Sequence, residues 1–279
     1  MITLPQTAPP RGLPWADTPL DDPERGWRYV RVTLPDGREV SQTVPLTPAD
    51  FLNPQEGDVM PQRPFHAQAT RDLADMLQTR YAGNPAVTVF NDLIMDWDIP
   101  GLPNPSPDVS VVPDVREPER ERGGRFNVQL EGTRPVLALE VVSPHYRKED
   151  REDKVAIYAK AGIREYVIFD HRTRRGQGID EVLGYRLLEN AYLPMSPDED
   201  GFVYCETVGL RMGLDNGRVV LIDGETGARL PTHTEAVARA DAEAARAETE
   251  TAARKEAEAR LAILEAELER LRGSGEAKL

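Results

Sequence analysis

Leu-Ala-Leu-Glu-Val-Val-Ser-Pro, at residues 137–144, is the stretch of this chain that decides the fold. Residues 136–142 form an apolar run interrupted only by Glu140, which is typical of a central strand buried on both faces. Two further apolar runs accompany it, Pro-Asp-Val-Ser-Val-Val at 107–112 and Tyr-Val-Ile-Phe at 166–169. A charged side chain in such a setting is costly unless it is paired or binds a cation. Asp108 and Glu140 are therefore the first candidates for a functional site.

The segments around these strands predict an α/β protein with a mixed β-sheet core flanked by helices. Apolar residues recur at helical spacing between Phe65 and Tyr81, and Gly83-Asn84-Pro85 then stops the helix. A second helix is predicted over 150–161, with Gly162 as its stop. Further strands are expected at about 86–95, 181–188, 202–208 and 217–222, completing one mixed sheet.

The N-terminal part reads as an addition to this core. Its first 25 residues are rich in Pro, Asp and Thr and are expected to be flexible. Trp27 to Val44 predicts two strands around the turn Pro35-Asp36-Gly37. Residues 1–44 are therefore interpreted as a flexible N-terminus and a β-hairpin, and 45–230 as the main domain.

Residues 234–272 differ in composition, being rich in Ala, Glu and Arg without Gly or Pro, and predict one long helix. Leucines alternate at spacings of three and four, as in a coiled-coil seam, at positions 261, 264, 268 and 271. The same pattern is compatible with a single solvated helix. We favour a short coiled coil that makes the protein a homo-oligomer such as a dimer, with parallel and antiparallel arrangements both open.

Bulk properties narrow the class of protein. The net charge of −14 argues against a general DNA-coating role, although it leaves a nuclease possible because steering depends on the local field. A single cysteine, Cys205, excludes an internal disulfide and fits a reducing cytoplasm. We expect no membrane span, since no apolar run approaches about 20 residues, and no signal peptide. The expectation is a soluble cytoplasmic protein.

Over roughly residues 45–190 the chain resembles the Uma-two family of restriction endonucleases, a branch of the PD-(D/E)XK nuclease superfamily. The resemblance rests on Pro107-Asp108, on Glu140-Val-Val-Ser-Pro144, and on Asp150 with Lys154 and Tyr158. It also includes Gly162, Glu165-Tyr166 and Asp170. It implies a restriction-endonuclease-like fold for 45–230 and a metal-dependent endonuclease that hydrolyses DNA.

The resemblance also implies roles for individual residues. Asp108, Glu140 and the backbone carbonyl of Val141 would bind Mg²⁺ or Mn²⁺, with waters completing an octahedral shell. The family pattern departs here at Val142, where the superfamily has a lysine that Val cannot replace. The matching lysine is Lys154, on the following helix, which would position the attacking water and stabilise the charged phosphate.

Simpler interpretations stay open for each residue. Asp108 is compatible with capping a turn, Glu140 with a structural salt bridge to Lys154, and Lys154 with an exposed i, i+4 pair with Asp150. His66 and Asp150 are possible accessory residues. The alternative function is a binding or scaffold protein with reduced catalysis that oligomerises through its helical tail. The sequence does not separate DNA from RNA as substrate or define a target sequence.

Overall fold

The computed structural model describes residues 23–118 and 123–276. The chain divides into two compact units, Met1–Leu230 and Pro231–Leu279. The expected flexibility of residues 1–25 falls largely on residues 1–22, which lie outside the described residues.

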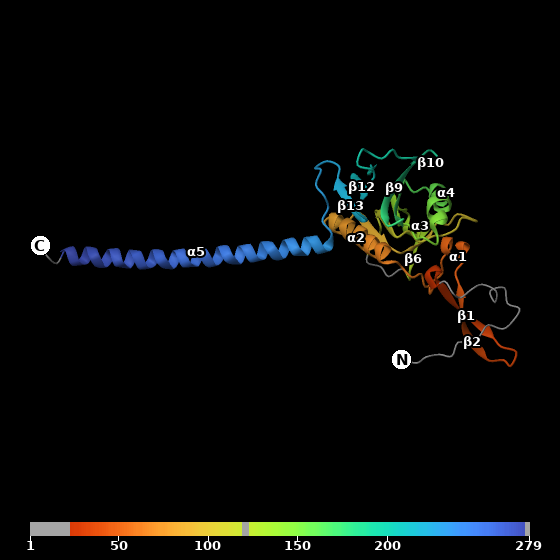
Figure 1. Cartoon of the computed structure of the whole chain (residues 1–279), viewed down its shortest axis with the longest axis horizontal. Coiled ribbons are helices and arrows are strands. Elements are labelled where there is room, and N and C mark those ends of the chain that lie inside the picture. The colour runs from red at the N-terminus through yellow and green to blue at the C-terminus, as the bar shows by residue number, and fades with distance from the viewer. Residues whose placement is uncertain (1–22, 119–122, 277–279) are drawn as a thin grey trace. The chain divides into compact units, whose positions relative to one another are not determined.

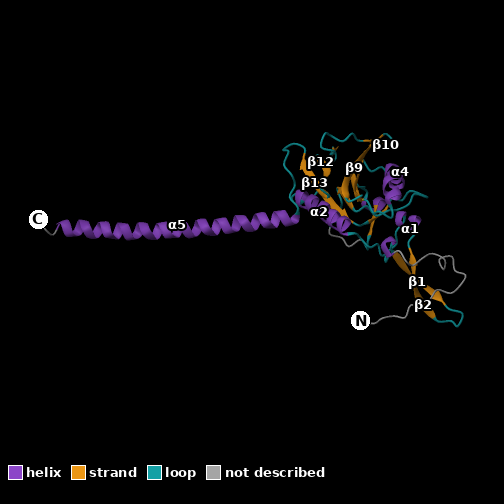
Figure 2. Ribbon diagram, in the orientation of Figure 1, coloured by secondary structure: helices purple, strands orange, loops and turns teal. Residues whose placement is uncertain are grey.

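A six-stranded mixed sheet forms the centre of the first unit, with the strand order β10-β9-β8-β7-β5-β3. Figures 1 and 2 label its strands β9 and β10. Only β7 and β8 run parallel, and the other neighbours are antiparallel. The strands are β3 (Val87–Asn91), β5 (Val109–Pro113), β7 (Leu137–Val141), β8 (Glu165–Arg174), β9 (Gln177–Leu188) and β10 (Ala191–Pro194). The predicted α/β class with a mixed sheet is confirmed.

Strand β7 has neighbours on both sides, and all five of its residues are buried, as the apolar run predicts. Because side chains alternate along a strand, its residues divide between two cores. Leu137, Leu139 and Val141 pack with helix α2 (Pro64–Tyr81) and with a second sheet. Ala138 and Val142 pack with helix α4 (Lys154–Ala161). Glu140 shares their parity, so its side chain is directed toward α4.

The structure corrects two details of the predicted sheet. The expected strand at 86–95 is broken, since Asp92 adopts a left-handed backbone with φ of 50° between β3 and β4 (Ile94–Asp96). Strand β4 then pairs in parallel with β6 (Arg125–Asn127), next to the short helix α3 (Val128–Glu131).

The strands expected at 202–208 and 217–222 do not extend the central sheet. They belong to a separate three-stranded sheet in the order β11-β12-β13, formed by Val203–Cys205, Leu210–Asp215 and Arg218–Asp223. The buried side chains of this sheet pack on the α2 face of the central sheet, where they share one apolar core with α2 and β7.

The region before α2 contains a short helical turn η1 (Pro23–Arg25), the predicted hairpin of β1 (Trp27–Thr33) and β2 (Glu39–Pro45), and helix α1 (Pro48–Leu52). Thr47 caps α1, since its side chain accepts a hydrogen bond from the Asp50 N–H while Asp50 accepts one from Thr47. Arg28 pairs with Asp58 at 2.8 Å and with Asp50 at 3.0 Å. These contacts attach the base of the hairpin to the residues that follow it.

The second unit contains helix α5 (His233–Glu276), which agrees with the predicted long C-terminal helix. Leu261, Leu264 and Leu268 are all more than half exposed on it, and so is Ile263. Within the described ranges, no helix is both long and apolar enough to cross a membrane.

Candidate functional site

A cavity of about 790 Å³ opens where the carboxyl end of β7 meets the start of α2. All six residues singled out from the sequence line it, namely His66, Asp108, Glu140, Val141, Asp150 and Lys154. The structure therefore brings together residues that are up to 88 positions apart, from His66 to Lys154.

Asp108 reaches the site through strand pairing. Strand β5 runs antiparallel to β7 with Val109 opposite Leu139, so the next residue outward, Asp108, lies beside Glu140. The Val141 N–H donates a hydrogen bond of 2.7 Å to Asp108 Oδ2. His66, in the first turn of α2, places Nε2 at 3.3 Å from the same oxygen. Asp108 is thus fixed by main chain on one side and by an imidazole on the other.

Lys154 is buried between two carboxylates rather than exposed on its helix. Its Nζ lies 2.8 Å from Glu140 Oε1 and 3.0 Å from Asp150 Oδ1, and the side chain is 2% exposed. The same ammonium lies 4.4 Å from the centroid of the Phe51 ring, a cation–π contact. The exposed i, i+4 pair is therefore excluded as a description of Lys154, although its contact with Asp150 does exist.

The start of the helix explains this placement. A π-helical turn, η2 (Glu149–Asp153), precedes α4, and such turns are frequent at functional sites. Asp150 is buried on this turn, where the Ser143 N–H donates to Oδ2 and the Tyr166 hydroxyl donates to its backbone carbonyl. These bonds fix η2 against the end of β7, so that Lys154 in the following turn faces Glu140.

Charge is unbalanced in this cluster. Burial raises the pKa of Glu140 well above its ordinary value, Lys154 opposes this shift, and the negative charges of Asp108 and Asp150 add to it. Burial alone would lower the pKa of Lys154, but Glu140, Asp150 and Asp108 together raise it, so the ammonium stays protonated. Three carboxylates thus face one ammonium and one imidazole.

The two remaining groups respond to each other. Burial acts to raise the pKa of Asp108, but the charge and hydrogen bond of His66 outweigh it, and the pKa of Asp108 is lowered. Burial acts to lower the pKa of His66, but Asp108 outweighs it, and the pKa of His66 is raised. Asp108 is therefore the carboxylate that ionises most readily in the cluster.

The donor set is compatible with a hard divalent cation. Two carboxylates and a backbone oxygen are ligands that Mg²⁺ accepts, and a cation beside Asp108 and Glu140 would offset their repulsion. Among the residues that the structure describes, no three His, Cys, Asp or Glu side chains are grouped so as to hold a metal by themselves. Any metal here would therefore also need backbone, water or substrate oxygens, as Mg²⁺ usually does.

Sequence reasoning missed two contacts of this site. The Tyr158 hydroxyl donates a 2.7 Å hydrogen bond to Glu140 Oε1, whereas the sequence suggested only a core aromatic residue. Its spacing of four from Lys154 places both on one helix face, which was the available signal. The cation–π partner Phe51 comes from α1, far away in the chain, and no local pattern indicates it.

One family model and one solved structure are similar to this chain. The family model Uma2, described as "Putative restriction endonuclease", matches residues 55–215. The crystal structure of "a putative nuclease belonging to DUF820" from Anabaena variabilis ATCC 29413 is similar with a TM-score of 0.38 and 15% sequence identity, covering 64% of this chain and 82% of that one. No curated protein matches the chain. The family match covers more than half of the chain and spans the cluster from His66 to Tyr158.

Proposed function

This chain belongs to the Uma2 family, described as "Putative restriction endonuclease", and on that premise we propose that it is a metal-dependent endonuclease that hydrolyses DNA phosphodiester bonds. The observation that carries the proposal is the placement of Asp108 and Glu140 on adjacent strand ends beside a buried, protonated Lys154. Family membership supports a nuclease, and the acidic pair at the open end of a sheet supports metal assistance. The nuclease domain is proposed to span residues 45–230.

In this proposal Asp108, Glu140 and the Val141 carbonyl hold Mg²⁺ or Mn²⁺. The ion would supply an activated water and a Lewis acid for the phosphate. Asp108 suits a ligand because its pKa is lowered, so it is ionised at neutral pH. The Val141 N–H and His66 keep its carboxylate oriented.

Lys154 has a role that follows from its protonation. An ammonium with a raised pKa cannot accept a proton at neutral pH, so Lys154 is excluded as a general base. It can donate hydrogen bonds, orient the attacking water and offset negative charge that develops on the phosphate. Its contacts with Glu140 and Asp150 hold it in place before substrate arrives. Asp150 therefore serves as the positioning residue for Lys154.

One observation favours the alternative function, a nuclease-fold scaffold with reduced catalysis. Lys154 and Glu140 already satisfy each other as a buried ion pair, an arrangement that also works as a structural element. The function would then be carried by the helical tail, residues 234–272. In either case we propose that residues 234–272 mediate homo-oligomerisation, since Leu261, Leu264 and Leu268 are exposed on one helix. We also propose a cytoplasmic location, because Cys205 is buried and unpaired.

Cleavage of supercoiled plasmid separates the two functions. We expect the wild-type protein to nick or linearise plasmid with Mg²⁺ or Mn²⁺ and to be silent with chelator. The Glu140→Gln variant should be inactive, while Glu206→Gln, which changes an exposed glutamate in the same way, should match the wild type. Activity that survives in Glu140→Gln would overturn the proposed site. Wild-type protein inactive on plasmid, linear and single-stranded DNA would favour the scaffold.

A further inference from the structure

The β8–β9 hairpin extends beyond every neighbouring strand of the central sheet. Strand β7 pairs with β8 only as far as Val141 opposite Phe169, and β10 pairs with the far end of β9. From Asp170 to Arg174, β8 pairs with β9 alone. The outer part of the hairpin, residues 171–180, is therefore a two-stranded ribbon that pairs with no third strand of the described sheets.

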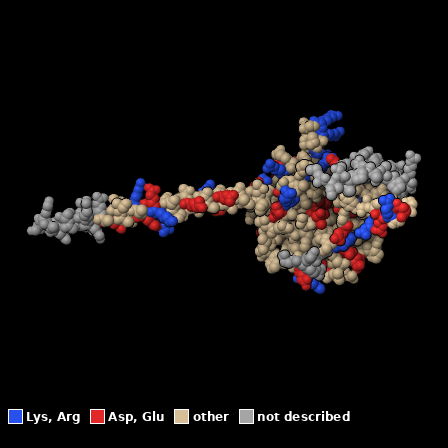
Figure 3. Space-filling view, turned by 90° about the horizontal axis from the view of Figure 1, so that it is seen from below, with Lys and Arg blue, Asp and Glu red and all other residues tan. Residues whose placement is uncertain are grey.

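This ribbon is basic in an acidic protein. Residues 171–180 contain three arginines, Arg172, Arg174 and Arg175, against one acidic residue, Asp180, while the whole chain carries −14. The Asp180 carboxylate already has two partners. Its Oδ1 lies 2.6 Å from His171 Nδ1, and its Oδ2 accepts a hydrogen bond of 2.9 Å from the Gly217 N–H. In Figure 3 Lys and Arg side chains gather at the tip of a narrow projection from the first unit.

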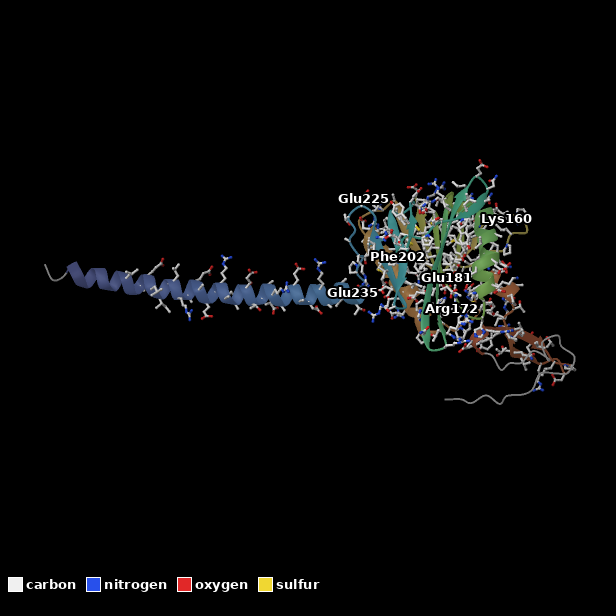
Figure 4. All side chains as sticks on the ribbon, turned by 45° about the horizontal axis from the view of Figure 1, so that its top comes forward. Lys160, Arg172, Glu181, Phe202, Glu225 and Glu235 are labelled. Carbon is white, nitrogen blue, oxygen red and sulfur yellow. The ribbon has the colours of Figure 1, made fainter. Side chains whose placement is uncertain are left out.

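The arginines of the region divide into two groups. Arg172 pairs with the buried Asp170 at 3.0 Å and with Glu181 at 3.1 Å, and Arg151 binds the same two carboxylates. Figure 4 shows Arg172 and Glu181 close together on the adjacent strands. Within residues 23–118 and 123–276, Arg174 and Arg175 form no ion pair and are exposed. Two guanidinium groups at the tip are thus available to a ligand.

The ribbon is also held in a defined place beside the cavity. His171, Arg172 and Thr173 line the cavity that contains Asp108 and Glu140. The His171 ring packs on Phe65 of α2 with centroids 4.8 Å apart, next in sequence to His66. The turn between β12 and β13 supports the opposite strand through Gly217. A ligand that extends out of the cavity on this side meets the ribbon.

We propose that the β8–β9 ribbon is a DNA-contacting arm, in which Arg174 and Arg175 bind backbone phosphates flanking the scissile bond. This inference rests on the proposed nuclease function. Guanidinium groups bind phosphate oxygens with paired N–H donors. The strand from Arg172 to Arg174 spans about 7 Å at the usual strand rise, a length over which duplex DNA presents about four phosphate charges. The arm supplies local positive charge that the net charge of the chain does not.

The test measures how DNA binding depends on salt. A fluorescein-labelled duplex is titrated with protein in chelator, which prevents cleavage, and fluorescence anisotropy gives the affinity from about 50 to 200 mM salt. For Arg174→Ala/Arg175→Ala the slope of log affinity against log salt should be shallower by about two. Over that range, the wild-type affinity should fall about ten-fold more than that of the variant.

Two matched variants control this measurement. Arg239→Ala/Arg246→Ala removes the same charge from exposed positions on α5 and should keep the wild-type slope. Arg174→Lys/Arg175→Lys keeps the charge at the tip and should therefore have a salt slope close to that of the wild type. Plasmid cleavage by the Ala variant should fall at limiting DNA and recover at saturating DNA.

The possible outcomes test the DNA-contacting arm separately from the proposed nuclease function. A wild-type protein that binds and cleaves DNA, with an Ala variant of unchanged slope, would overturn the arm and leave the nuclease standing. Equal loss in the α5 control would also overturn it, since only total charge would then matter. A wild-type protein that neither binds nor cleaves DNA would overturn both.

Discussion

Two buried glutamates on adjacent parallel strands, Glu140 and Glu165, have opposite surroundings. They are 2% and 1% exposed and lie on β7 and β8. Glu165 is fully matched: Arg186 binds Oε1, and the N–H groups of Glu206 and Thr207 and the Thr207 hydroxyl donate to its two oxygens. Glu140 has Lys154 and Tyr158, but it also faces Asp108 and Asp150.

The difference teaches how to distinguish a structural buried charge from a functional one. The partners of Glu165 are a cation and neutral donors, so its charge is compensated and nothing further is needed. The surroundings of Glu140 carry an excess of negative charge beside a cavity, so a cation or a substrate group can still be accommodated. Both glutamates are equally buried, so the balance of positive and negative charge around each one distinguishes the structural glutamate from the functional one.

Plasmid cleavage should depend strongly on Glu140 and little on Glu165, and this is the largest effect we expect. Glu140→Gln should lower plasmid cleavage at least about 100-fold, because it removes a proposed ligand of the ion that activates the water and the phosphate. Glu165→Gln, assayed at a temperature where it remains folded, should stay within a few-fold of wild type. Equal losses of cleavage rate in both variants would remove the distinction.

Stability should show the reverse order. Glu165→Gln leaves Arg186 and two N–H groups without their carboxylate and should cost on the order of 3 kcal/mol in urea unfolding. Glu140→Gln should be neutral or stabilising at neutral pH, because it relieves repulsion with Asp108 and Asp150.

The effect of Glu140→Gln on the free energy of unfolding should depend on pH. The pKa of Glu140 is raised by burial and by its acidic neighbours, so the folded state binds its proton more tightly than the unfolded chain does. The wild type therefore loses stability relative to Glu140→Gln as pH rises from the unfolded value of about 4.3 through the raised folded pKa. A stability difference that is flat with pH would contradict the charge imbalance.

Lys154→Met is a sharper probe of the same cluster. It leaves Glu140 and Asp150 buried without their ammonium and should destabilise the fold by roughly 3–5 kcal/mol. Mg²⁺ should then raise the thermal midpoint of the variant more than that of wild type, because the ion replaces part of the missing positive charge. Identical Mg²⁺ shifts in both proteins would show that no ion binds near Lys154.

Removal of the tail should have the smallest effect on the site. A chain ending at residue 232 lacks α5 and should be smaller in oligomeric state by light scattering, with cleavage per protomer little changed. The double change Leu261→Glu/Leu264→Glu, at exposed seam positions, should give the same oligomeric state as truncation. An unchanged number of protomers per particle in either protein would contradict the coiled-coil proposal.

Local patterns in the sequence predict many of the strands and helices of this protein. The run at 136–142 predicts β7 and isolates Glu140, and helical spacing predicts α2, because both depend on residues close in the chain. The sequence could not show that Glu165 is buried with its charge compensated, because its partners Arg186 and Thr207 lie far from it in the chain. The sequence also did not predict that β11, β12 and β13 form a separate sheet, because the position of this sheet depends on packing against α2, which is distant in the chain.

The most direct test is calorimetric titration of Mn²⁺ into wild type, Glu140→Gln and Glu165→Gln, each with a duplex oligonucleotide present. Substrate oxygens are included because two carboxylates and a carbonyl do not complete the shell of the ion. We predict Mn²⁺ binding by wild type and Glu165→Gln, and none by Glu140→Gln. Binding of equal affinity to Glu140→Gln, or none to wild type, would contradict the assignment of Glu140 and Asp108 as a metal site.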